Sequence, residues 1–125
     1  MADVNKVILI GNTTRDTELR ATKSGTPVAN MRLATNRTVN GQELTQYHTV
    51  IAWDKLADLL GKFATKGRKV YVEGRLEYRS YKDREGKERE AAEIMAQDVQ
   101  FLDAKGKIDA SGADGERVEP EDVAV

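Results

Sequence analysis

The chain has 125 residues, of which 39% are hydrophobic and 33% charged, and its formal net charge is −1. This is enough for one globular domain with a core, and the absence of cysteine excludes disulfides, thiolate metal sites and cysteine nucleophiles. The single histidine, His48, cannot form a histidine-based metal site by itself. No apolar run is long enough to span a membrane and the first residues lack a signal-peptide pattern, so we expect a cytoplasmic protein without metal or cofactor.

Charge is unevenly distributed along the chain. Residues 1–102 contain 17 Lys and Arg against 14 Asp and Glu, a net of +3, whereas residues 103–125 contain 3 against 7, a net of −4. The segment from residue 105 onward also has no aromatic residue and only scattered aliphatic ones, too few to offset the entropy of ordering it. We therefore predict a folded domain over residues 1–104 and a disordered acidic tail over residues 105–125.

The first half of the domain is predicted to form three strands. The β-branched run of residues 4–11 favours the first strand, and the alternation in residues 28–36 favours the second, with Ala29, Met31 and Leu33 on one face. Asn40-Gly41 is a strong hairpin signal. The third strand, residues 46–53, has two faces: Tyr47, Thr49, Ile51 and Trp53 on one, His48, Val50 and Ala52 on the other.

The second half is predicted to contain one helix and two strands. Leucines and a phenylalanine at helical spacing predict a helix over residues 54–66, with Asp54 as its N-cap and Gly67 just beyond its end. A strand follows over residues 68–80, in which Gly74 suggests a bulge. Residues 88–102 have helix propensity, but they are needed as the partner of that strand, so we predict a strand. Five strands with a helix after the third is the order of an OB-fold, a five-stranded Greek-key barrel.

The residues with potential chemistry are aromatic side chains next to basic ones. Trp53 lies two residues before Lys55, and Tyr78, Arg79 and Tyr81 lie together near the end of the fourth predicted strand. This combination is typical of surfaces that stack nucleic-acid bases without reading sequence. Phe63 and Phe101 are instead expected in the core. No nucleophile or oriented carboxylate accompanies His48, so we expect no enzymatic activity.

Four segments, in order and with matching spacing, resemble the bacterial single-stranded DNA-binding protein family. They are VNKVILIGN (4–12), PVANMRLAT (27–35), YHTVIAWDKLA (47–57) and KGRKVYVEGRL (66–76). The resemblance covers about residues 4–102 and implies an OB-fold and a cytoplasmic, nucleoid-associated homotetramer. It also implies sequence-independent binding of single-stranded DNA in replication, repair and recombination.

The resemblance also implies roles for individual residues. The family's stacking aromatics fall on Tyr47, Trp53 and Tyr81. A further stacking position falls on Val39, which is not aromatic, so Tyr78 is the candidate to replace it. The family's basic contacts fall on Lys6, Lys55, Lys66 and Arg79. Its oligomer-interface positions fall on His48 and Tyr71, both of which we expect to face outward.

The family's acidic tail usually closes with Pro-Phe and recruits replication and repair proteins. This sequence has Glu119-Pro-Glu-Asp122 followed by Val123-Ala-Val125, so the acidity is present and the terminal Pro-Phe is not. Two alternatives stay open from the sequence. One is a primosome-type or RNA-binding OB-fold protein, and the other is a protein–protein interaction module.

Overall fold

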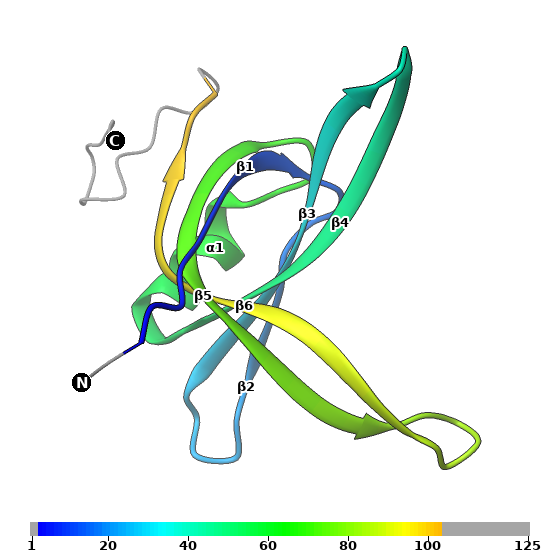
Figure 1. The fold of residues 1–125 in the computed structure, drawn as a ribbon. Helices are drawn as coiled ribbons and strands as arrows, with labels where there is room; N and C mark the ends of the chain where they lie inside the picture. The colour runs from blue at the N-terminus through cyan, green and yellow to red at the C-terminus, as the bar shows by residue number, and fades with distance from the viewer. Residues whose placement is uncertain (1–2, 104–125) are drawn as a thin grey trace.

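The computed structural model describes residues 3–103, and the predicted disordered tail lies outside them. The described part contains six strands and one helix: β1 (Val7–Thr13), β2 (Glu18–Ala21), β3 (Pro27–Val39), β4 (Gln42–Trp53), α1 (Asp54–Phe63), β5 (Lys69–Lys82) and β6 (Glu88–Phe101). The strands follow the order β1-β5-β6-β4-β3-β2, and a further pairing of β1 with β3 closes five of them into a barrel (Figure 1). The predicted OB-fold barrel is confirmed.

The barrel closes at a seam between β1 and β3, where Asn12 pairs with Ala34 and Thr13 with Leu33. Next to this seam, a Cβ atom on Gly11 would lie 2.3 Å from the carbonyl oxygen of Ala34. Only glycine allows the two backbones to come this close. The first strand was predicted to end at Gly11. In the structure Gly11 lies inside β1, which continues to Thr13.

The core consists of the inward-facing side chains of the barrel strands and one side of α1. The alternation predicted for β3 and β4 is confirmed within the barrel, where Ala29, Met31 and Leu33 of β3 and Val50 and Ala52 of β4 are fully buried. Phe101 is buried as expected. The buried apolar residues are Ala29, Met31, Leu33, Val50, Ala52, Ala57, Leu60, Ala64, Val70, Val72, Ile94, Val99 and Phe101. Phe63 packs against this cluster from the helix.

Two hairpins extend beyond the barrel (Figure 1). β3 and β4 remain paired as far as Val39 and Gln42, joined by Asn40-Gly41 with the two positive φ angles that the predicted turn requires. β5 and β6 remain paired as far as Lys82 and Glu88. Residues 88–101 are therefore a strand, as predicted from pairing and against local helix propensity. The predicted bulge is also confirmed, because the β5–β6 register shifts between Glu73 and Gly74.

The helix differs from its prediction at both ends. Its N-cap is Trp53, not Asp54, and no side chain caps it. It ends at Phe63, three residues before the predicted end, and Gly67 lies in the following turn. The cause is tertiary: Arg68 donates to the carbonyl of Phe63 at 2.9 Å, and Thr17 donates to the carbonyl of Ala64 through its backbone N–H and its hydroxyl.

Strand β2 was not predicted. All four of its residues are exposed, and its two apolar residues, Leu19 and Ala21, alternate over too short a run to mark a strand. They form one because residues 27–30 of β3 offer an unpaired edge that β2 covers. Among the described residues, no helix is both long and apolar enough to cross a membrane.

Candidate nucleic-acid interface

Cross-strand pairing aligns the outward side chains of five strands on one continuous surface. Trp53 on β4 pairs with Val28 on β3, which pairs with Arg20 on β2. In the next row, Ile51 lies between Asn30 of β3 and Met95 of β6. Directly paired residues share a face of the sheet. We call this surface the outer face; its residues are Arg20, Val28, Asn30, Arg32, Tyr47, Thr49, Ile51, Trp53, Glu77, Arg79, Glu93 and Met95.

The aromatic residues of β4 lie on the outer face and are exposed. Tyr47 is 57% exposed and Trp53 44% exposed, whereas Val50 and Ala52 between them point inward and are fully buried. The division of this strand into two faces, predicted from the spacing of its residues, is confirmed. Aromatic rings held on a rigid strand with one side in water are available for stacking on planar ligands.

Arg32 is a cation of the outer face that the sequence analysis did not single out. Its guanidinium carbon lies 5.3 Å from the ring centroid of Tyr47, within the range of a cation–π contact. Arg32 alternates with the buried Met31 and Leu33, so the alternation that identified the core of β3 also placed this cation outside. The sequence did not show that Arg32 contacts Tyr47, because the two residues belong to different strands.

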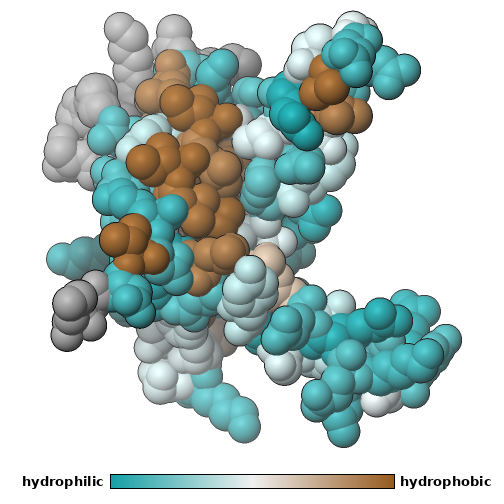
Figure 2. All heavy atoms as spheres, viewed as in Figure 1, coloured by the Kyte–Doolittle hydropathy of each residue, from teal (hydrophilic) through white to brown (hydrophobic). Residues whose placement is uncertain are grey.

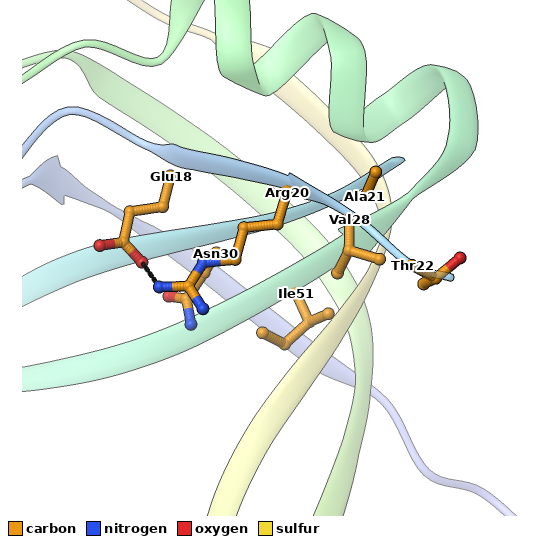
Figure 3. A pocket seen from close by; sticks show the side chains of 7 residues that line it. All are labelled: Glu18, Arg20, Ala21, Thr22, Val28, Asn30 and Ile51. Atoms are coloured by element: carbon orange, nitrogen blue, oxygen red, sulfur yellow. Dashed lines mark ion pairs between the residues drawn. The ribbon is translucent and has the colours of Figure 1, made fainter. Parts of the chain in front are cut away.

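A hollow on the outer face lies beside Trp53. Its floor contains Val28, Ile51 and Met95, and the polar groups of Asn30, Arg79 and Glu93 also line it. A second hollow on the β2 side shares Val28, Asn30 and Ile51 with the first (Figure 3). The two hollows therefore adjoin, and together they extend from β2 to the β5–β6 hairpin.

The β5–β6 hairpin carries the remaining predicted stacking residues. Tyr81 is 42% exposed, and the guanidinium of Arg79 lies 5.7 Å from its ring centroid. Arg79 is also ion-paired with Glu93 at 2.9 Å, which raises the pKa of the arginine. Tyr78 is 66% exposed. The alternation of β5 directs its side chain away from that of Tyr81, and Tyr78 also lines the hollow beside Trp53.

The three predicted lysine contacts do not gather on the outer face. Lys6 forms a 2.5 Å ion pair with Glu73 on the β1–β5 side of the barrel. Lys55 lines a separate hollow between α1 and β6. Lys66 lies after the helix, where its backbone N–H donates to Asp16 at 2.8 Å. Their contacts with DNA remain predictions.

The two predicted interface residues lie in different surroundings. Tyr71 points outward from β5, as expected, and its hydroxyl donates to Glu73 at 2.8 Å, which raises the pKa of the tyrosine. The outward orientation expected for His48 is wrong. His48 shares the inner face of β4 with Val50, is partly buried, and its Nε2 lies 2.9 Å from the hydroxyl of Thr35.

An apolar area covers the outside of the barrel near β1 and β5 (Figure 2). Ile8 and Ile10 are 57% and 51% exposed there, and their cross-strand partners are Glu73 and Tyr71. Exposed apolar side chains grouped on a sheet are typical of an interface with another protein surface. Of this group, only Tyr71 is an interface position predicted from the sequence.

The closed barrel, with exposed aromatic rings beside cations on its outer face, defines an OB-fold protein with a surface of the oligonucleotide-binding type. Comparison with known proteins gives the family. The chain belongs to the single-strand binding protein family, whose sequence model matches residues 4–102.

Relatives and a solved structure agree with this assignment. The chain is 45% identical over 118 residues to single-stranded DNA-binding protein 1 of Chlorobaculum tepidum, covering 86% of this chain and 73% of that protein. It is 40% identical over 111 residues to single-stranded DNA-binding protein 1 of Xylella fastidiosa, covering 84% and 82%. A Plasmodium falciparum SSB complex with ssDNA superposes with a TM-score of 0.76 at 29% identity, covering 82% of this chain and 98% of that one.

Proposed function

We propose that this protein binds single-stranded DNA without sequence preference, as a non-enzymatic protein of replication, repair and recombination. The observation that carries the proposal is the pair of exposed rings, Tyr47 and Trp53, on one rigid strand face with Arg32 against the first. Every base has a π-face, so stacking tolerates any sequence and contributes ~1–3 kcal/mol per base. Cations that neutralise phosphates add affinity that decreases with salt.

In this proposal the stacking residues are Tyr47, Trp53, Tyr81 and Tyr78. Tyr47 lies against Arg32 and Tyr81 against Arg79. Trp53 and Tyr78 line the same hollow, which Arg79 also lines. Phosphates outside the hollow beside Trp53, where the DNA leaves the outer face, would be contacted by Lys6, Lys55 and Lys66.

The same proposal includes a homotetramer. The apolar area containing Ile8, Ile10 and Tyr71 supports an interface between copies of the chain, because association would remove these side chains from water. His48 would contribute by supporting the base of the β3–β4 hairpin through Thr35. The acidic residues 105–125 would attract replication and repair proteins through their charge.

Titration with oligothymidylate, followed by native mass spectrometry, tests the proposal. We expect saturable, salt-sensitive quenching of tryptophan emission, weaker binding of duplex DNA and of RNA of equal length, and a mass of four chains. Preference for RNA would favour the RNA-binding alternative. No salt-sensitive binding to any oligonucleotide would favour an interaction module, and a monomeric mass at micromolar concentration would contradict the tetramer.

A further inference from the structure

Strand β2 brings an arginine into line with Trp53. Arg20 pairs with Val28, and Val28 pairs with Trp53, so the three residues form one row across β2, β3 and β4. Directly paired residues share a face, and neighbouring strands are 4.7–4.9 Å apart, so Arg20 begins about 10 Å from Trp53 on the same outer face. A residue on β2 is therefore within one or two nucleotides of a base stacked on Trp53.

The hollow beside Arg20 has the composition of a shallow nucleotide site. Val28 and Ile51 form an apolar floor, and Asn30 supplies a polar amide. Figure 3 shows the side chain of Arg20 lying across this hollow toward Glu18 and Asn30. Val28, Asn30 and Ile51 also line the hollow beside Trp53, so the two hollows adjoin.

The charge of Arg20 is only weakly neutralised. Its side chain is 80% exposed, and the nearest carboxylate oxygen of Glu18 lies 3.8 Å from its Nη2. Arg79, at the other end of the outer face, has a carboxylate at 2.9 Å. An exposed ion pair at the longer distance contributes little stability. A phosphate can therefore replace Glu18 as the partner of Arg20 at little cost.

We propose that the hollow beside β2 is a further nucleotide subsite, in which Arg20 binds a backbone phosphate and the base lies over Val28 and Ile51. The subsite extends the path of the bound DNA from Trp53 across β3 to β2. The proposal rests on the single-stranded DNA-binding function proposed above. It adds β2, a β-strand that was not predicted from the sequence, to the DNA-binding surface.

The test compares two variants that remove the same charge from opposite sides of β2. Arg20→Gln removes the proposed phosphate contact. Lys62→Gln removes an exposed cation of α1, the helix that packs under β2 through Leu19 and Gly61. For each variant, the affinity for oligothymidylate is measured by Trp53 emission at several salt concentrations, and thermal melting confirms the fold.

We expect Arg20→Gln to bind more weakly and to reduce the slope of log K against log salt by ~0.7 per binding site, the value for one single-strand phosphate contact. Lys62→Gln should keep the wild-type slope. Glu18→Gln should bind more tightly, since it removes the carboxylate that competes with phosphate.

Equal slopes for Arg20→Gln and wild type, or equal losses for Arg20→Gln and Lys62→Gln, would overturn the subsite. Both results leave wild-type binding intact, so they separate this proposal from the proposed function. Absence of salt-sensitive quenching in the wild type would overturn both.

Discussion

The guanidinium of Arg79 donates to one carboxylate oxygen of Glu93 from Nε at 3.1 Å and from Nη2 at 2.9 Å. The side chain of Glu93 is 12% exposed and that of Arg79 is 60% exposed, so a partly buried anion holds an exposed cation. The same guanidinium lies 5.7 Å from the ring centroid of Tyr81. Arg79 is therefore positioned against the ring, but its charge is already neutralised.

This ion pair predicts that Glu93→Gln strengthens DNA binding. The amide oxygen still accepts from Arg79 and keeps it near Tyr81, while the released positive charge becomes available to phosphate. We expect a steeper salt dependence, by up to ~0.7 in the slope of log K against log salt per site. Asp83→Asn is the matched control, because Asp83 pairs with Arg89 at the base of the hairpin turn. An unchanged slope for Glu93→Gln would show that Arg79 does not reach phosphate.

Trp53 is predicted to stack directly on a base. It is the chain's single tryptophan, so its emission reports one location. Stacking should quench that emission at a fixed ratio of nucleotide to protein. Trp53→Ala should cost ~1–3 kcal/mol per occupied site, and Trp53→Phe should keep most of the affinity because a π-face remains.

Trp53 is 44% exposed and is not part of the buried cluster, so Trp53→Ala should remain folded. Thermal melting of the variant provides the control. Unchanged emission on DNA binding, together with a large loss of thermal stability in Trp53→Ala, would instead make Trp53 a structural residue.

His48 is predicted to make stability depend on pH. Burial lowers the pKa of His48 below its usual value, because the charged ring is poorly solvated there. The unfolded chain therefore binds more protons than the folded one as pH falls below about 6.5, and folding stability decreases with it.

Urea denaturation at pH 7.5 and at pH 5.5 measures this effect. The difference between the two urea midpoints should be smaller in His48→Gln than in the wild type. Glutamine can still bond to Thr35, but it has no titratable ring. Since His48 is the only histidine, an identical difference in wild type and variant would assign the pH dependence to carboxylates.

Two glycine substitutions should have different effects on stability. In Gly74→Ala the new Cβ would lie 2.2 Å from the backbone oxygen of Met95, which is fixed in the β5–β6 ladder. In Gly61→Ala the nearest atom is Leu19 Cδ2 at 2.9 Å, the end of a flexible and 47% exposed side chain.

We expect Gly74→Ala to destabilise the fold by ~1–3 kcal/mol through steric strain. Gly61→Ala should be close to neutral or stabilising, because alanine gains ~1 kcal/mol of helix propensity over glycine. Urea unfolding of both variants checks the contrast, and equal losses would contradict it.

The sequence by itself determined the elements whose signals are local. Alternation with a period of two placed Tyr47 and Trp53 on one face of β4 and Val50 and Ala52 on the other. Asn40-Gly41 identified the hairpin that joins β3 to β4. These features depend on backbone geometry within a few residues, so the sequence carries them without knowledge of the fold. The same periodicity places Tyr47 and Trp53 on one face of β4, whereas their exposure is known only from the structure.

Only the tertiary structure decided which neighbours those residues have. β2 is a strand because β3 offers an edge, and α1 ends early because Arg68 and Thr17 take its last carbonyls. Arg79 contacts Glu93, which is fourteen residues away in the chain, and Arg20 lies in one row with Trp53 through two strand pairings. Strand register and barrel closure set these contacts, and both depend on pairing between segments distant in the chain, which no local pattern encodes.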